Sequence, residues 1–206
     1  MVTSAGTQMK QCPFCAKQTP AEAVACTHCR ASLNAADWAP RAAYSYVQPV
    51  WHLVLLSIAT FGVYPVYWFY KSWQQVGEYT GKAMSPGWRT VGLFVPILGL
   101  VFIYDLLTDV SHMLTAKAMK ATVNPGWVLG MLIAGAVCWR LPDPLWLLGQ
   151  LAVLPLAIVQ SDMNRLWGAS IPDKPIRSRL SPAEIAVLVL GGILMVLVLL
   201  GLALPE

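Results

Sequence analysis

The C-terminal end of the chain sets the strongest limit on its fold. Residues 185–204 are 20 consecutive positions without a charged or polar side chain. A helix of about 20 apolar residues is long enough to cross the hydrocarbon core of a bilayer. Over the whole chain 57% of the residues are hydrophobic and 12% are charged, whereas ordinary globular proteins are about a quarter charged. The sequence therefore predicts an all-α polytopic membrane protein.

Other hydrophobic segments precede this helix and bring the expected total to four to five. They cover residues 50–73, 91–104, 127–139 and 145–159. The first is interrupted at residues 60–62 and Pro65, and it ends in an aromatic cluster beside Lys71. Because aromatic rings with polar tips favour the headgroup boundary, we expect the cluster to lie there. The last two flank a tight turn at residues 140–144, which predicts a helical hairpin.

The charged loops allow two membrane arrangements. If all five segments cross, one outer loop carries several cations, against the positive-inside rule. Those cations are Lys71, Lys82 and Arg89. If the first two segments instead enter and return as hairpins, with bends near Gly62 and Pro96, every basic loop lies on one side and only Arg140, balanced by Asp143, lies on the other. We expect spanning helices, because non-helical backbone at membrane depth must be buried by protein.

Four cysteines near the N-terminus form two CxxC pairs separated by ten residues. They are Cys12, Cys15, Cys26 and Cys29. Two such pairs can bring four thiolates to the tetrahedral geometry that Zn²⁺ accepts. Two disulfides are the alternative, but the N-terminus shows no signal-peptide pattern, and cytosolic thiols stay reduced. We expect a structural zinc that drives folding of the head, because its few large apolar residues cannot supply a core.

We divide the chain into a zinc ribbon at residues 1–33, a linker at residues 34–48 and a helical transmembrane domain at residues 49–206. The head resembles the zinc-ribbon heads common at the N-termini of bacterial proteins, with the pattern CPxC, spacer, CxxC, small residue and leucine. It departs from that pattern at Ala16 and Arg30, where such ribbons usually have glycine to permit a positive φ. We expect His28, inside the second CxxC, to be a surface residue.

Residues 60–71, TFGVYPVYWFYK, resemble the signature T-x-G-x-Y-x-x-Y-W-x-Y-K of a bacterial membrane family, the domain of unknown function 4234. Residues 160–166, QSDMNRL, are similar to the Q-x-x-x-N-x-x-N/W ending of that family's last shared segment. The resemblance spans roughly residues 48–205 and implies no activity. We expect the protein in the bacterial inner (cytoplasmic) membrane, with the zinc ribbon on the cytosolic side.

Polar residues within the hydrophobic segments are candidates for a second site. Asp105, Asp109 and His112 are spaced to share one face of a helix, where they could bind a proton or a metal. The interpretation we favour is a polar face that emerges into the headgroups, so we expect these residues to be dispensable for folding. Gln160 and Asn164 could bond a neighbouring helix, but we expect them at the membrane interface.

Small residues recur at every fourth position of the segment that starts at Trp127. They are Gly126, Gly130, Ala134 and Cys138. Faces of this kind admit a closely packed neighbouring helix in membranes. We therefore expect Gly130 to tolerate no larger side chain.

The function that the sequence favours is a non-enzymatic scaffold or sensor whose cytosolic zinc ribbon recruits a protein partner. The alternative is a small transporter or channel-like protein that uses the intramembrane polar residues. We expect no catalytic residues, because no Ser-His-Asp set, HExxH motif or phosphate-binding loop is present. The formal charge of +4 is modest and its cations lie between apolar segments, so the expected partners are the bilayer and a cytosolic protein rather than nucleic acid. Homo-oligomerisation is left open.

Overall fold

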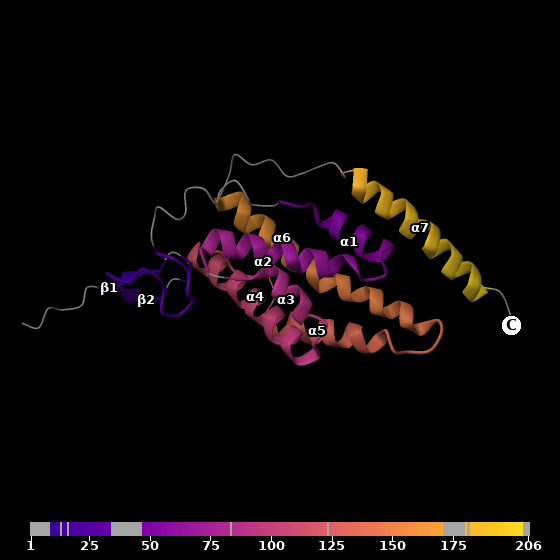
Figure 1. Ribbon diagram of the computed structural model, residues 1–206, viewed down its shortest axis with the longest axis horizontal. Helices are drawn as coiled ribbons and strands as arrows, with labels where there is room; N and C mark the ends of the chain where they lie inside the picture. Colours follow the sequence, from indigo (N-terminus) through magenta and orange to yellow (C-terminus); the bar gives the residue numbers. More distant parts are fainter. Residues whose placement is uncertain are drawn as a thin grey trace, which may run out of the picture.

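The computed structural model describes residues 9–12, 14–15, 17–33, 47–82, 84–122, 124–170, 180 and 182–203. Within these residues a small β head adjoins one end of a helical body (Figure 1). The head contains the antiparallel strands β1 (Met9–Gln11) and β2 (Gln18–Pro20), with Met9 opposite Pro20. The helices of the body are α1 (Val50–Ala59), α2 (Tyr64–Thr80), α3 (Pro86–Gly92), α4 (Pro96–Ala116), α5 (Pro125–Cys138), the 3-10 helix η3 (Leu145–Ala152), α6 (Val153–Ser170) and α7 (Pro182–Ala203).

The first hydrophobic segment is a helical hairpin. The Thr60 hydroxyl accepts a hydrogen bond from the Tyr64 N–H at 2.8 Å and donates one to the Leu56 carbonyl at 2.7 Å. Phe61 and Gly62 then take positive φ values of 50° and 82°, which ends α1 and reverses the chain. With 10 residues, α1 is about 15 Å long, half of a bilayer core. The expected span over residues 50–73 is therefore not confirmed, and the segment folds as two helices joined by a tight turn.

Pro96 starts a helix rather than lying inside one. It occupies the first turn of α4, where its missing N–H costs no hydrogen bond. The preceding segment is the separate short helix α3, so the expected apolar segment at residues 91–104 is divided between two helices. As predicted from the sequence, α4 continues through Asp105, Asp109 and His112, and it ends at Ala116.

The hairpin predicted around residues 140–144 is present, and its turn meets the turn of the first hairpin. α5 and the η3–α6 segment are joined there, with the rings of Trp139 and Trp146 at a centroid distance of 5.4 Å. The ring of Phe61 lies 6.3 Å from that of Trp146. At the opposite end, the Tyr79 hydroxyl near the end of α2 donates to Ser170 at the end of α6 at 3.3 Å. The two hairpins therefore point the same way.

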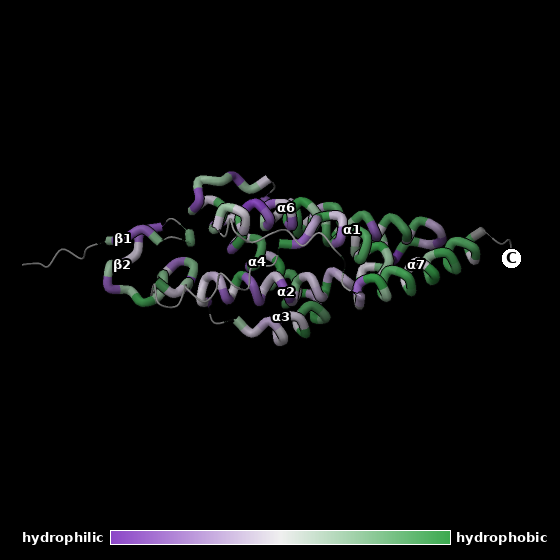
Figure 2. Tube along the Cα trace, turned by 90° about the horizontal axis from the view of Figure 1, so that it is seen from above, coloured by the Kyte–Doolittle hydropathy of each residue, from purple (hydrophilic) through white to green (hydrophobic). Residues whose placement is uncertain are grey.

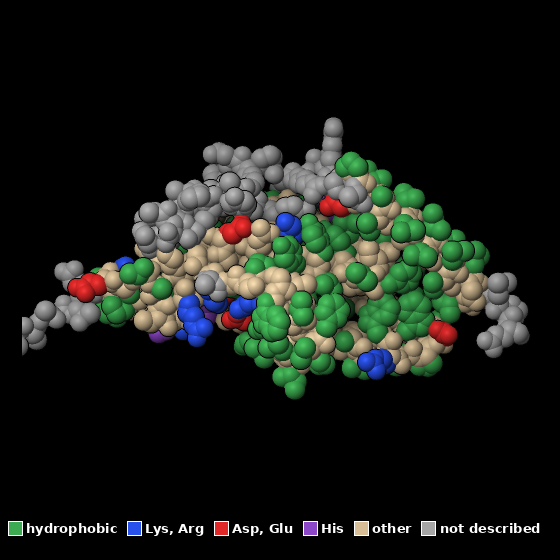
Figure 3. Space-filling view, viewed as in Figure 1, with side chains coloured by type: hydrophobic (Ala, Val, Ile, Leu, Met, Phe, Trp, Pro, Cys, Tyr) green, Lys and Arg blue, Asp and Glu red, His purple; other side chains and the backbone are tan. Residues whose placement is uncertain are grey.

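Three helices of the described residues are long and apolar enough to cross a membrane. They are Pro96–Ala116, Leu145–Ser170 and Glu184–Leu202, whereas α1 and α5 are apolar but shorter. The structure thus supports three candidate spans rather than four to five. Hydrophobic side chains cover much of the body away from the head, and α7 is hydrophobic along its length (Figures 2 and 3). Exposed apolar surface of this extent favours lipid contact.

The aromatic cluster of the first segment belongs largely to the core. The cluster consists of Tyr64, Tyr67, Trp68, Tyr70 and Trp73. Three of its rings are at most 8% exposed and belong to the main hydrophobic core with residues of α4 and α6, namely Tyr64, Trp68 and Trp73. Of the cluster, Tyr67 is the strongly exposed member, at 47%. The expectation that these rings lie at the headgroup boundary is therefore wrong for the three buried rings. They hold α2 against the helices on either side of it.

The close contact of α5 lies on a different face from the one predicted. A Cβ atom at Gly130 would meet no neighbouring atom within 4 Å in the described part of the chain, and one at Gly126 would meet only the nearby Asn124 side chain. A Cβ at Gly135 would overlap the Cβ of Ala152 in η3. The small-residue face at Gly130 is thus open, because the hairpin partner packs at Gly135.

Alanine substitutions at these two glycines should have opposite effects. We expect Gly135→Ala to lower the unfolding free energy by about 1–3 kcal/mol, the usual cost of overpacking. We expect Gly130→Ala to leave it unchanged or to raise it by up to about 1 kcal/mol through helix propensity. Thermal unfolding of the purified protein in detergent measures both. A lower melting temperature for Gly130→Ala alone would show that a neighbouring helix packs at Gly130, as predicted from the sequence.

Candidate metal centre and polar clusters

Two turns of the head bring the four predicted ligand cysteines together. The Sγ atoms of Cys12, Cys15, Cys26 and Cys29 all lie within 4.8 Å of one another. Cys12 and Cys29 are separated by 3.7 Å between sulfurs, and so are Cys15 and Cys26. Four thiolates bound tetrahedrally at about 2.3 Å from a metal lie about 3.8 Å apart. All four are free thiols, so the group can hold a metal ion without a change of backbone.

The two CxxC turns have the same local structure. The Phe14 N–H points at the Cys12 sulfur, and the His28 N–H points at the Cys26 sulfur, both at 3.4 Å. Each N–H follows its cysteine by two residues, so each turn supplies a donor that stabilises a thiolate. His28 itself is exposed and is not one of the four converging residues.

Arg30 stands where zinc ribbons usually have glycine, and it adopts the backbone conformation that the glycine would have. It takes a positive φ of 60°, the conformation for which glycine is usually required. Its N–H donates to the Cys26 carbonyl at 2.9 Å, and the Cys26 N–H donates to the Ala31 carbonyl at 2.8 Å. The second turn therefore closes with arginine at this position. Ala16, the other departure, lies outside the described residues.

The thiols differ in their readiness to ionise. Burial raises the pKa of Cys15 to about 11. Burial also opposes ionisation of Cys26, but hydrogen bonds from the Cys29 and His28 backbone outweigh it and lower that pKa to about 7. Cys26 therefore becomes a thiolate more readily than Cys15, and a cation bound at the group would displace the Cys15 proton.

The head lies directly against the helical body. The ring of Phe14, between the first two cysteines, packs edge-on against Tyr79 of α2 at a centroid distance of 5.5 Å. Tyr79 in turn packs edge-on against Trp167 of α6 at 5.1 Å. The Ser32 N–H donates to the carbonyl of Thr80 at 2.8 Å. The metal centre is thus in contact with the end of the α1–α2 hairpin, although most of the expected linker lies outside the described residues.

A buried hydrogen-bond network joins the two sequence motifs. The Trp68 indole N–H donates to the side-chain oxygen of Gln160, whose amide donates to Asn164 at 2.7 Å. Asn164 donates to the Gln48 carbonyl at 2.8 Å, and the Gln48 amide donates to the Tyr64 hydroxyl at 2.8 Å. Gln160 is 3% exposed. The expectation that Gln160 and Asn164 lie at the membrane interface is therefore wrong, because they pair with α2 and with the segment before α1.

The carboxylates of α4 are paired with cations from the preceding loop and helix. The Lys82 ammonium lies 2.8 Å from Asp109 and 3.6 Å from Asp105, and Arg89 lies 2.8 Å from Asp105. The Lys82 and Asp109 side chains are only 12% and 10% exposed. His112 does not form a metal-binding group with them. The predicted headgroup-facing stripe is thus, at Asp109, a buried ion pair that fixes α4 to the end of α2.

Sequence reasoning missed three residues that complete these contacts. Gln48 and Tyr79 lie outside both motifs, and no local pattern distinguishes them. Asp162 lies inside the second motif, where its carboxylate accepts from the Thr122 N–H at 2.7 Å and pairs with Arg165 at 2.9 Å. The sequence pattern that could have identified Asp162 is its position three residues before Arg165 in an otherwise apolar helix.

Removal of one ligand should empty the metal centre. We expect the purified protein to carry one tightly bound metal ion per chain and Cys26→Ser to lose it, because the head has too small a core to hold its turns without metal. The control is Cys138→Ser, which changes the fifth cysteine, on α5. Metal analysis after reduction measures both. Full occupancy in Cys26→Ser would show that this thiol is not a ligand.

Loss of the Asp109 charge should destabilise the body. Asp109→Asn leaves the Lys82 ammonium buried without its closest anion, so we expect the unfolding free energy to fall by about 1–3 kcal/mol. The control is Asp143→Asn, at an exposed acid in the turn between α5 and η3. Thermal unfolding in detergent compares them. Equal melting temperatures for Asp109→Asn and the unsubstituted protein would show that the Asp109 carboxylate is hydrated and that its ion pair does not stabilise the body.

Among the comparisons with known proteins, one family model matches the region that contains the first motif, residues 60–71. Neither a curated protein nor a solved structure matches the chain. The second motif, residues 160–166, lies outside the region that a family model matches. That model, described as Domain of unknown function (DUF4234), matches residues 48–98, which confirms the resemblance that the signature in residues 60–71 indicates.

Proposed function

We propose that this protein is a non-enzymatic membrane scaffold or sensor whose head binds one structural Zn²⁺ and recruits a cytosolic protein. The observation that carries the proposal is the four-cysteine group, in contact with the helical body through Phe14 and Tyr79. Four thiolates fill the tetrahedral shell of zinc and leave no open position for a substrate, as in structural sites. A rigid head on a membrane anchor suits binding rather than turnover.

The charge distribution supports a cytosolic head. Lys82 follows α2, while Lys117 and Lys120 lie in the segment between α4 and α5. Arg165 near the end of α6 donates to the Lys120 carbonyl at 3.5 Å, and α6 ends beside the head through Tyr79. Lys and Arg side chains accordingly gather where the head adjoins the helices (Figure 3). The positive-inside rule favours the cytosol for that end.

The polar residues of the transporter alternative are engaged inside the protein. Asp109 is paired with Lys82 at 2.8 Å, and Gln160 bonds Trp68 and Asn164. Side chains whose partners come from the same chain have their hydrogen-bonding capacity committed, so a permeating ion or solute would have to displace those partners. These contacts favour a structural role for the residues and leave the head as the main interaction site.

Val24 is the best position from which to detect a partner. It lies between the two CxxC turns and is 74% exposed, so its side chain is accessible from solution. Its carbonyl accepts from the Leu33 N–H at 2.7 Å, so the backbone at this point is held. A side chain held outward in this way can carry a crosslinker toward a bound partner.

A photo-crosslinking amino acid at Val24 in living cells tests the recruitment role. We expect a discrete adduct with a cytosolic protein, lost when Cys26→Ser removes the metal-held fold of the head. The matched control carries the crosslinker at Trp127, an exposed apolar residue of α5, and should give no such adduct. Recruitment would be refuted if the Val24 adduct persisted in Cys26→Ser, or if position 24 crosslinked only to lipid or to non-cytosolic proteins.

A further inference from the structure

A groove between α4 and α5, which lie side by side (Figure 1), is not used by the metal centre or the buried polar contacts. It has a volume of about 470 Å³. Pro96, Leu100 and Ile103 of α4 line one side, and Ile133 and Val137 of α5 line the other. Ile133 and Val137 are 43% and 61% exposed, so this apolar groove is open at the surface of the body. Because α4 is long and apolar enough to cross a membrane, the groove lies beside lipid chains.

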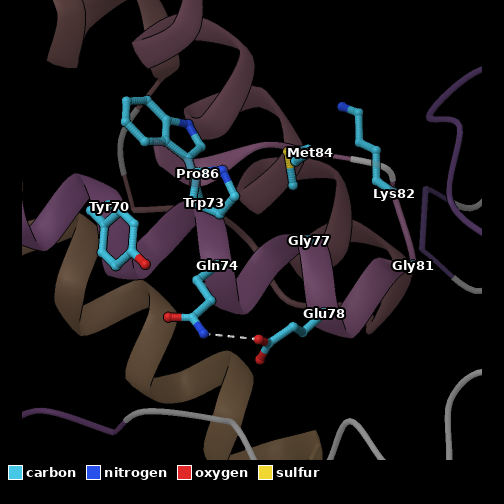
Figure 4. Close-up of a pocket in the computed structure, with 9 residues that line it drawn as sticks. All are labelled: Tyr70, Trp73, Gln74, Gly77, Glu78, Gly81, Lys82, Met84 and Pro86. Carbon is cyan, nitrogen blue, oxygen red and sulfur yellow. Dashed lines mark hydrogen bonds between the residues drawn. The ribbon is translucent and has the colours of Figure 1, made fainter. Parts of the chain in front are cut away.

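The groove beside α2 has a different character. Figure 4 shows Gln74 and Glu78 in it, joined by a hydrogen bond of 3.0 Å, with the Lys82 ammonium directed away from Glu78. Lys82 is paired with Asp109 at 2.8 Å. The cation that lines this second groove is therefore already neutralised within the chain.

Arg140 gives the α4–α5 groove an exposed cation at one end. It follows the end of α5 by two residues and lines the groove together with Val137. Among the described residues no carboxylate forms an ion pair with it, although Asp143 lies three positions further along the chain. A guanidinium presents its N–H donors in a fixed fork that matches the oxygens of a phosphate. This end of the groove therefore favours a phosphate group.

The surroundings of Arg140 place it at the level of lipid headgroups. Trp139 precedes it, and the Trp139 ring lies 5.4 Å from that of Trp146. Trp side chains are enriched where a membrane meets water. From Arg140 the groove extends past Val137 to Ile133, about 10 Å along the helix axis. An apolar chain with an anionic head matches this sequence of a cation followed by apolar walls.

We propose that the groove binds an anionic phospholipid, with one acyl chain between α4 and α5 and its phosphate at Arg140. The apolar walls supply dispersion contacts with the chain and do not distinguish one phospholipid from another. Arg140 supplies the selection, because a zwitterionic lipid such as phosphatidylcholine brings its own cation close to its phosphate. The inference does not depend on the recruitment role, because the groove lies on helices of the body and its tests do not involve the head.

Photo-crosslinking with labelled lipids tests the site in the unsubstituted full-length protein. Phosphatidylglycerol or phosphatidylcholine with a diazirine in the acyl chain is added to phosphatidylcholine nanodiscs, and mass spectrometry locates the adducts. We expect phosphatidylglycerol to exceed phosphatidylcholine about tenfold at Ile133 and Val137, the effect of one charge-assisted hydrogen bond. The control positions Leu190 and Leu197 of α7, 62% and 58% exposed, should react equally with both lipids. Equal adducts of the two lipids at Ile133 and Val137 overturn the proposal.

Two substitutions that remove the same charge give an independent measurement. Arg140→Gln should lower the ratio of phosphatidylglycerol to phosphatidylcholine adducts in the groove about tenfold, because the phosphate loses its charged partner. The matched control Lys117→Gln, at the exposed residue that follows α4, should leave the ratio unchanged. An unchanged ratio in Arg140→Gln, or the same fall in Lys117→Gln, overturns the assignment of the phosphate to Arg140.

The oligomeric state of the same samples tests a different occupant of the groove. Native mass spectrometry reports the number of chains in each complex. Chains that carry the phosphatidylglycerol adduct at Ile133 or Val137 support the lipid, whatever their number. A dimer in which these residues gain no lipid adduct would mean that a second copy of the chain covers the groove, and the proposal would be overturned.

Discussion

The buried amide network between α2 and α6 is the interaction on which the body depends. Gln160 uses its oxygen for Trp68 and its nitrogen for Asn164, and Asn164 continues to the Gln48 carbonyl. In a low-dielectric interior each of these groups would cost free energy if it lost its partner. Only one register of α6 against the α1–α2 hairpin pairs them together. The network therefore selects one arrangement among the many that apolar packing alone would allow.

Helix α2, which contributes Tyr64 and Trp68 to the network, also packs against the head. Along α2, Tyr64 and Trp68 reach the network, and Tyr79 packs against Phe14. Because Phe14 lies inside the first cysteine turn, the geometry of that turn decides where its ring stands against α2. The four-cysteine group is thus joined to the end of α2 by direct side-chain packing.

Paired hairpins reconcile the loop charges with the hydrophobic segments. The turn at Gly62 and the turn beside Trp139 lie at the end away from the head, and a Cβ at Gly62 would be 3.6 Å from Trp139. The loop residue Lys82 is consequently on the head side, where Asp109 neutralises it. The sequence already offered this arrangement as the alternative to five spans, since it places the basic loops together. What favours it is the positive φ at Phe61 and Gly62 together with the shortness of α1.

Local spacing alone determined the four-cysteine group, the hairpin around residues 140–144 and the apolar helix α7. In each case the interacting residues lie in one helix or in segments that follow each other closely along the chain, so short-range geometry brings them together wherever the segment is placed. Tertiary structure decided the partners. Trp68 meets Gln160 across 92 positions, and Gly135 rather than Gly130 receives Ala152. No local period encodes such contacts, because they depend on how separate helices stack once their buried polar groups have been satisfied.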